Sequence, residues 1–229
     1  MKIELKGVEK WYNRGGINEV HALRGIDLAI SENEIVCIHG PSGSGKSTLL
    51  AVLGGIIGPT SGSAVVDGKK LARLPDRFLT LYRREYVGFI FQRFQIISEL
   101  SVLENVTLPL LPLGIKPAEQ RRRAMELLEL LSIGHRAHFP AAQISGGELQ
   151  RVAIARAMIN DPSIILADEP TAHLDRALSL EFLSIIAGFK ERGKTIVIAS
   201  HDPLVSGSSI VDRCLQMHDG RLEEPKQSR

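Results

Sequence analysis

The sequence has few cysteines, little net charge and no long hydrophobic run. Cys37 and Cys214 are its only cysteines, each in an apolar stretch, so there is no disulfide framework and a reducing compartment is indicated. A formal net charge of +2 gives no reason to expect nucleic acid or an acidic membrane surface as a partner. These features exclude a disulfide-rich secreted domain and a strongly basic nucleic-acid-binding protein.

The lack of long hydrophobic runs bears on the membrane. The longest apolar stretch, residues 49–58, contains three glycines and falls far short of the roughly 20 residues that cross a bilayer. The first ten residues alternate charged and apolar side chains, unlike a signal peptide. We therefore expect no direct membrane span, and work at a membrane would need another chain to cross it. An apolar content of 44% still provides for a sizeable core.

Strand and helix patterns divide the chain into three blocks. Period-two alternation and short apolar runs predict strands in the first block, one of which, residues 86–92, ends at Gln92, and Asp67-Gly68 is a hairpin-turn signal. In the middle block helical spacing predominates, and in the last block the continuous apolar runs 163–168 and 194–200 predict buried parallel strands. We predict an α/β domain over residues 1–229, with a core of residues 1–92 and 161–229 and a helical subdomain of residues 93–160.

The clearest motif is GPSGSGKS, which matches G-x-x-x-x-G-K-[ST] in full between a predicted strand and a predicted helix. Its glycines let backbone N–H groups converge on an anion, and the helix N-terminus adds positive charge. We expect Lys46 to reach the β- and γ-phosphates of a nucleotide, Ser47 to bind Mg²⁺ and Thr48 to lie near the α-phosphate. A glycine-rich turn without a ligand is the alternative, and the complete motif disfavours it. The predicted phosphate-binding residues are Gly40, Pro41, Ser42, Gly43, Ser44, Gly45, Lys46, Ser47 and Thr48.

A second motif is the acidic pair that follows the apolar run ending at residue 167. Asp168 and Glu169 stand at the carboxyl end of a predicted parallel strand, where a side chain points into the ligand crevice. Asp168 suits Mg²⁺, which prefers oxygen ligands and keeps several waters. Glu169 could accept a proton from an attacking water. By itself the pair also fits a solvated strand end; beside a complete phosphate loop, a catalytic pair is favoured.

A third motif, SGGE, precedes a predicted helix. Ser145 is a natural N-cap and Glu148, three residues on, completes a capping box, which is the purely structural explanation. Functionally, Gly146 and Gly147 expose backbone N–H groups at a helix N-terminus and offer a second anion site. One nucleotide does not need two such sites from one chain. A dimer, in which the second site of each copy closes on the nucleotide of the other, gives each second site an anion to bind.

Taken together, these motifs resemble the nucleotide-binding subunit of ATP-binding-cassette (ABC) transporters over nearly the whole chain. Phosphate loops occur in many NTPases, whereas SGGE some twenty residues before DEP is highly specific to this family. The resemblance implies a phosphate-loop NTPase (RecA-like) core with an antiparallel β subdomain and an inserted α-helical subdomain. It also implies ATP and Mg²⁺ as ligands and ATP hydrolysis as the activity, with Lys46, Glu169 and His201 as the catalytic residues.

Further roles within one copy follow from the resemblance. Tyr12 would stack on adenine; Trp11 is the rival, but alternation along the strand puts it on the opposite face. Gln92 would touch Mg²⁺, together with Ser47 and Asp168, and report the nucleotide to the membrane partner. His201 would contact the γ-phosphate.

Other roles act between copies. Ser145, Gly146 and Gly147, with Glu148, would form the signature that binds the γ-phosphate held by a second copy, and Asp175 would link the two sites. Two departures from the family pattern stand out. Glu148 replaces the usual glutamine and adds negative charge, from which we expect tuned affinity. His173 stands where glycine or asparagine is common, and its effect has no account.

Finer resemblance points to the branch with macrolide-exporter, lipoprotein-release and cell-division ATPases. The implied function is a motor subunit, working as a dimer at the cytoplasmic face of the cell membrane on a separate transmembrane permease that exports or extracts a substrate. The alternative is an ATP-gated regulatory module of a non-transporting membrane complex, as in cell division. The apolar stretch Leu108 to Gly114 is either core or the lining of a groove that receives the permease.

Overall fold

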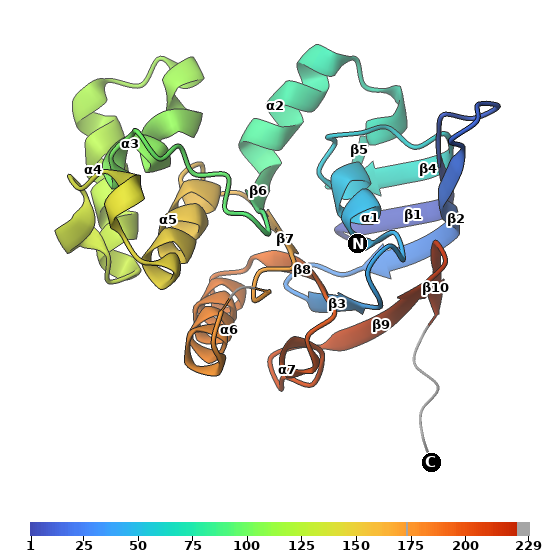
Figure 1. Cartoon of the computed structure of the whole chain (residues 1–229). Helices are drawn as coiled ribbons and strands as arrows, with labels where there is room; N and C mark the ends of the chain where they lie inside the picture. The colour runs from blue at the N-terminus through green and yellow to red at the C-terminus, as the bar shows by residue number, and fades with distance from the viewer. Residues whose placement is uncertain (173, 224–229) are drawn as a thin grey trace.

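The computed structural model describes residues 1–172 and 174–223, which form two sheets and a separate group of helices (Figure 1). His173 lies outside the described residues. The predicted α/β class is confirmed, with an antiparallel sheet at one side and inserted helices at the other.

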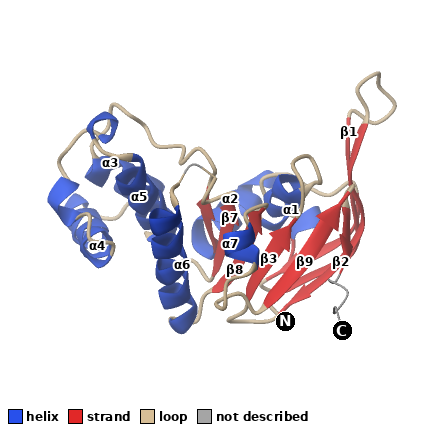
Figure 2. Ribbon diagram, turned by 60° about the horizontal axis from the view of Figure 1, so that its bottom comes forward, coloured by secondary structure: helices blue, strands red, loops and turns tan. Residues whose placement is uncertain are grey.

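The first sheet is antiparallel and has the strand order β2-β1-β4-β5. Its strands are β1 (Ile3–Tyr12), β2 (Val20–Ile30), β4 (Ser61–Val66) and β5 (Lys69–Lys70). Asp67 and Gly68 join β4 to β5 with φ values of 49° and 72°, as an Asp-Gly hairpin turn requires. The loop between β1 and β2 projects from the body of the molecule (Figure 2).

The second sheet has the order β10-β9-β3-β8-β7-β6, and only β10 runs antiparallel to its neighbour. Its strands are β3 (Ile35–His39), β6 (Val87–Ile90), β7 (Ile164–Asp168), β8 (Thr195–Ser200), β9 (Arg213–His218) and β10 (Arg221–Glu223). Because β3, β7 and β8 are parallel neighbours, their carboxyl ends meet at one edge. Gly40, Asp168 and His201 therefore gather there.

Helices cover both faces of this sheet. The helices near the sheets are α1 (Lys46–Leu53), α2 (Asp76–Tyr86), α6 (Arg176–Glu191) and α7 (Pro203–Ser206), with the 3₁₀ turn η1 (Leu71–Arg73). The helical lobe consists of α3 (Val102–Thr107), α4 (Pro117–Leu130) and α5 (Gly146–Met158), with the 3₁₀ turns η2 (Leu108–Leu113), η3 (Gly134–Arg136) and η4 (Ala141–Gln143). The lobe lies to one side of the sheets (Figure 1).

Two hydrophobic clusters share the central sheet, one on each face. Ile35 and Cys37 of β3 point to the cluster that includes α6 and the helical lobe, while Val36 and Ile38 point to the cluster formed with α1 and the first sheet. This alternation is the period of two that a strand imposes. The helical lobe and α6 therefore pack on one face of the central sheet, while α1 and the first sheet pack on the opposite face.

Two elements differ from the prediction. β6 ends at Ile90, two residues before Gln92, because the chain turns: the N–H of Phe94 bonds to the carbonyl of Phe91 at 3.0 Å. The helix α2 was not predicted. Leu79, Tyr82 and Tyr86 recur at helical spacing and pack on the cluster formed with α1, so the apolar face of this helix was present in the sequence and was overlooked. Tyr82, its only buried residue, donates a 2.6 Å hydrogen bond from its hydroxyl to the carbonyl of Leu53.

Candidate nucleotide-binding site

The phosphate loop, residues 40–47, connects the end of β3 to the start of α1. A Cβ on Gly40 would lie 2.1 Å from the carbonyl oxygen of Met217 in β9, so only glycine fits there. On its other side the loop is tied to the turn after β9 by a 2.9 Å hydrogen bond from the N–H of Gly220 to the carbonyl of Ser44. The loop therefore owes its shape to the last hairpin of the described chain as well as to its own glycines.

Lys46 opens α1 and is 5% exposed. Its Nζ donates hydrogen bonds to the carbonyls of Gly40 at 2.8 Å and Pro41 at 3.0 Å, and lies 3.3 Å from Oε1 of Glu169. The ammonium thus sits inside the loop, beside the acidic pair that ends β7. A buried cation held by neutral carbonyls and a single carboxylate can bind an added anion.

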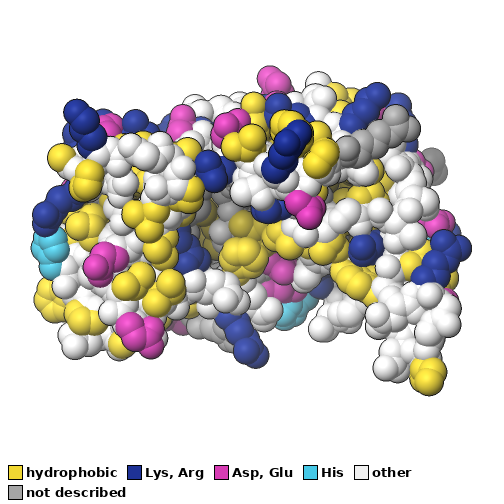
Figure 3. Space-filling model, turned by 90° about the horizontal axis from the view of Figure 1, so that it is seen from above, with side chains coloured by type: hydrophobic (Ala, Val, Ile, Leu, Met, Phe, Trp, Pro, Cys, Tyr) yellow, Lys and Arg dark blue, Asp and Glu magenta, His cyan; other side chains and the backbone are white. Residues whose placement is uncertain are grey.

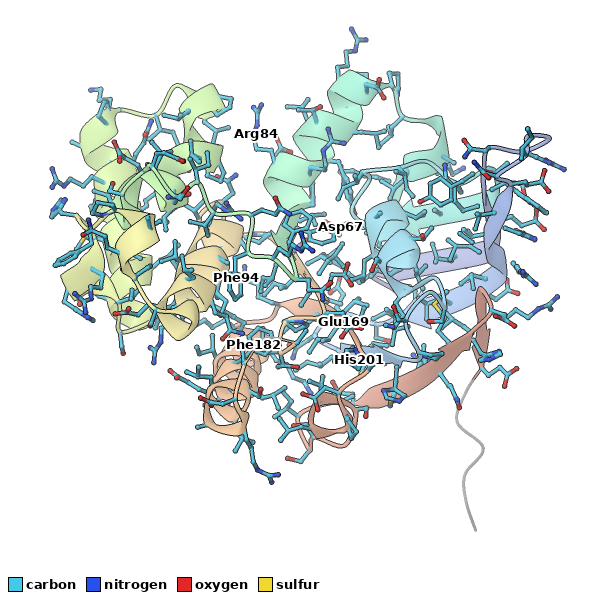
Figure 4. All side chains as sticks on the ribbon, in the orientation of Figure 1. Asp67, Arg84, Phe94, Glu169, Phe182 and His201 are labelled. Carbon is cyan, nitrogen blue, oxygen red and sulfur yellow. The ribbon has the colours of Figure 1, made fainter. Side chains whose placement is uncertain are left out.

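Glu169 is buried between Lys46 and His201. Its Oε2 lies 2.8 Å from Nδ1 of His201 and accepts a 3.2 Å hydrogen bond from the backbone N–H of that residue. Glu169 also has φ of 47°, in the left-handed region, and its own N–H bonds to the carbonyl of Ala199 at 2.8 Å. Figure 4 shows Glu169 and His201 together near the middle of the molecule. A strained backbone fixed by a neighbouring strand holds this carboxylate in one orientation.

Asp168 and Ser47 are joined across β7 and α1. The Ser47 hydroxyl donates to Oδ1 of Asp168 at 3.0 Å. Burial raises the pKa of the Asp168 carboxyl above its ordinary value, and the charge of Glu169 acts in the same direction, while the Ser47 hydrogen bond and Lys46 oppose it. A carboxylate that burial makes reluctant to ionise gains from a nearby divalent cation. Hydroxyl, carboxylate and amide oxygens form the donor set that Mg²⁺ prefers, and Gln92 lines the same cleft as Ser47.

The loop opens into a cleft of about 550 Å³ that is large enough for a nucleotide. Tyr12 also lines this cleft, and 37% of its surface is exposed. Trp11 does not line the cleft; it stacks on His21, with ring centroids 3.7 Å apart. The cleft is also lined by residues that were not predicted from the sequence: Glu19, Val20, His21, Ala22, Arg24, Asp219 and Gly220. No local motif marks them, because β2 and the β9–β10 turn reach the cleft only through tertiary packing.

The signature residues lie at the start of α5. Ser145 is the N-cap, and it forms the predicted capping box with Glu148. These residues line a cavity of about 370 Å³ together with Asp175, which caps α6 by accepting a 2.9 Å hydrogen bond from the N–H of Leu178. Among the described residues, none lines both this cavity and the nucleotide cleft. The structure thus brings Asp175 to the signature and keeps both apart from Lys46.

Arg136 is a further residue of this region that the sequence analysis missed. Its Nε donates to Oε1 of Glu148 at 2.9 Å. The backbone N–H of Ser145 is the main cause that lowers the pKa of Glu148 to about 2, and Arg136 and the Ser145 hydroxyl add to it against the effect of burial. Glu148 is therefore fully ionised at neutral pH.

A phosphate loop between a parallel strand and a helix faces an Asp–Glu pair at the end of a neighbouring strand. This combination defines a nucleotide-hydrolysing protein of the phosphate-loop class. The first sheet and the helical lobe, which accompany the central sheet, restrict the protein to a narrower family within the phosphate-loop class.

Comparison with known proteins gives the family. A family model described as ABC transporter matches residues 23–172. An uncharacterized ABC transporter ATP-binding protein of Thermotoga maritima is 45% identical, over 96% of this chain and 93% of that protein. The ABC transporter ATP-binding protein YtrE of Bacillus subtilis is 44% identical, over 92% and 90% of the two chains. The macrolide export ATP-binding/permease protein MacB of Hyphomonas neptunium is 41% identical over 96% of this chain, which spans only 34% of that protein.

A solved structure supports the same family. The ATP-binding cassette MJ0796, in a dimeric post-hydrolysis state bound to ADP and Pi, has a TM-score of 0.89 and 40% identity over 99% of both chains. The chain therefore belongs to the ABC transporter family, as an ATP-binding and ATP-hydrolysing subunit. Within residues 1–172 and 174–223, none of the helices has the length and apolar character to cross a bilayer.

Proposed function

We propose that two copies of this chain form the working ATPase, each ATP lying between the phosphate loop of one copy and the signature of the other. One observation carries the proposal: among the described residues, Lys46 and Ser145 line separate cavities. A single chain thus leaves its signature without a phosphate to bind, and a symmetric pair supplies one. The dimeric form of the similar MJ0796 cassette supports this arrangement. Asp175 shares the signature cavity and would connect the two sites.

Within each site the residues of one copy hold the triphosphate and prepare water. Lys46 exchanges the loop carbonyls for the β- and γ-phosphates. Ser47, Asp168 and Gln92 would hold Mg²⁺, which would supply neutralisation of phosphate charge. Glu169 acts as the general base, since its carboxylate is buried and held in one orientation. His201 contacts the γ-phosphate, and its hydrogen bond to Glu169 links the two groups. Tyr12, which lines the same cleft, stacks on the adenine.

Replacement of Glu169 tests this proposal. In Glu169→Gln the general base is lost while the phosphate loop is intact, so ATP affinity is kept and hydrolysis falls by about 10²–10⁴-fold. The trapped nucleotide then holds two copies together, and light scattering with ATP gives twice the monomer mass. ADP, which lacks the γ-phosphate, gives the monomer mass. Wild-type turnover would remove Glu169 from the mechanism, and a monomer with ATP would contradict the shared site.

A groove of about 480 Å³ between α2 and the helical lobe suits the permease. Pro109 and Pro112 of η2, Phe89 and Phe91 line it, and Leu111 beside it is 59% exposed. Seen from above, hydrophobic side chains gather around a hollow in this face (Figure 3). We propose that a short permease helix docks here, which assigns Pro109, Leu111 and Pro112 to partner contact, while Leu110 between them is buried in the core. The carbonyl end of that helix would face the arginines of the groove.

The groove is connected to the signature helix. Arg156 of α5 lines it, and its guanidinium donates to the carbonyls of Phe94 and Gln95, both at 2.5 Å. Movement of the helical lobe, proposed here as a unit of residues 93–160, is thereby coupled to the turn that follows Gln92. This connection supports a motor that drives a separate permease from the cytoplasmic face of the membrane. The exporter names of the MacB relatives favour export over a regulatory role.

Charge reversal in the groove tests docking. Arg84 lines the groove from α2, and Figure 4 shows it at the side of α2 that faces the helical lobe. Arg84→Glu should abolish co-purification of the chain with a membrane-spanning protein and the stimulation of its ATPase by that protein. Arg77→Glu, an equal charge change on an exposed part of the same helix outside the groove, is the matched control and should keep both. Equal behaviour of the two variants would contradict docking at this groove.

A further inference from the structure

Glu148 is held from two sides at the start of α5. Its Oε2 accepts hydrogen bonds from the backbone N–H of Ser145 at 2.7 Å and from the Ser145 hydroxyl at 2.9 Å. Its Oε1 accepts from Nε of Arg136 at 2.9 Å. The guanidinium of Arg136 also lies over the ring of Phe139, 4.8 Å from its centroid, which orients it toward Glu148. Serine, glutamate and arginine thus form one connected cluster.

The Ser145 hydroxyl has a single proton, and that proton goes to Glu148. In the function proposed above, the same hydroxyl donates to a γ-phosphate held by a second copy. Ser145 must therefore release Glu148 before it can bind the phosphate. The carboxylate and the phosphate compete for one donor.

They also compete as negative charges. A helix N-terminus favours one anion, and Glu148 already occupies this position at α5. Arg136 offsets part of its charge, and His135 lies 3.9 Å away. Arg151, which lines this cavity, is already in an ion pair with Glu181 of α6. An arriving phosphate therefore meets a carboxylate whose main neutralising partner is Arg136.

We propose that Glu148 restrains the ATP-driven pairing of two copies, and that Arg136 sets how strong this restraint is. The inference rests on the proposed shared site. The Glu148 carboxylate keeps the hydrogen bond from the Ser145 hydroxyl and repels the incoming γ-phosphate. The phosphate displaces the carboxylate only when the free energy of the other contacts between the two copies outweighs this cost. Since a symmetric pair contains two such sites, the effect on pairing counts twice. Both are positioning residues: they act through Ser145 and through charge.

The experiment uses the full chain with Glu169→Gln as the parent, so that ATP is not consumed. Glu148→Gln keeps the capping box and removes the charge. It should lower the protein concentration at half-maximal pairing with ATP by roughly three- to tenfold, as expected for a unit charge near the surface. Arg136→Gln leaves the carboxylate uncompensated and should raise that concentration by about the same factor. The double variant should pair like Glu148→Gln alone, because no carboxylate is left for Arg136 to neutralise, and the double-mutant cycle then gives a coupling energy different from zero.

Controls separate charge from folding. Arg122→Gln removes one positive charge from an exposed position of the same lobe and should pair like the parent. If Arg136→Gln unfolds at the working temperature, Arg136→Lys takes its place; it keeps the charge and should pair like the parent. Raising the salt from 0.1 M to 1 M shortens the Debye length from about 10 Å to 3 Å and should shrink the differences, which loss of a helix cap would not do.

The outcomes are distinct from those of the proposed function. If the parent does not pair with ATP, the shared site fails, and this inference fails with it. If the parent pairs but Glu148→Gln pairs equally or more weakly, at an unchanged melting temperature, only the restraint is overturned. A difference that appears equally with ADP would also overturn it, because ADP carries no γ-phosphate to compete for Ser145.

Discussion

At the scale of single residues, Glu148 predicts a specific acid response. Its pKa in the folded chain is about 2, below the ordinary 4.5, so the folded chain binds fewer protons than the unfolded chain between these values. The stability contributed by the ionised carboxylate is therefore complete above pH 4.5 and is lost as the pH falls toward 2. Urea unfolding of wild type and Glu148→Gln should give a difference in unfolding free energy that is constant above pH 5 and shrinks below 4.5. A difference in unfolding free energy that does not change with pH would contradict the lowered pKa of Glu148.

Residue chemistry was predictable where a local motif carries it. The phosphate loop, the capping box of Ser145 and the Asp-Gly turns each depend on neighbours within a few positions, and the structure has these local conformations. The roles of Tyr12, Gln92 and His201 stay predictions. Arg136 could not be predicted, because it pairs with Glu148 through the packing of η3 on α5 and no spacing rule covers that contact.

At the scale of elements, the phosphate loop depends on the β9–β10 hairpin. Gly220 has φ of 73°, and a Cβ there would lie 2.7 Å from the carbonyl of Ala22, while its N–H holds Ser44. Gly220→Ala should cost about 1–3 kcal/mol of stability and weaken ATP binding as the loop loses this support. The measurements are thermal unfolding and nucleotide titration.

The matched control is Gly188→Ala in α6. A Cβ at Gly188 meets nothing within 4 Å and its φ is not in the left-handed region, so alanine should raise stability by about 0.5–1 kcal/mol and leave ATP affinity unchanged. If Gly220→Ala bound ATP as tightly as this control, the hairpin would have no part in shaping the loop.

The buried strands of the central sheet were predictable, whereas the helix α2 and the end of β6 were not. β7 and β8 are buried along nearly their whole length and appear in the sequence as continuous apolar runs. The helix α2 was missed although Leu79, Tyr82 and Tyr86 recur at helical spacing and pack on the core. The end of β6 was also missed, because Phe94 and Gln95 turn the chain with φ of 52° and 53°, which non-glycine residues seldom adopt.

At the scale of the whole molecule, the division into an α/β core and inserted helices followed from the change of period along the chain. The strand order β10-β9-β3-β8-β7-β6 did not, since it is set by which apolar faces pack across the sheet. For the same reason the sequence did not reveal that β2 and the last hairpin line the nucleotide cleft. The separation of that cleft from the signature cavity became visible only in three dimensions.

Because the two cavities lie apart, two inactive variants should restore ATP hydrolysis when they are mixed. Lys46→Ala spoils one half of the centre, and Ser145→Arg the other, so neither variant alone hydrolyses ATP. In an equal mixture about half of the pairs are mixed, and each mixed pair regains one intact centre and one doubly damaged centre. Complementation to about a quarter of wild-type turnover is expected, measured as phosphate release after mixing. A mixture as inactive as its components would mean that each polypeptide carries its chemistry alone.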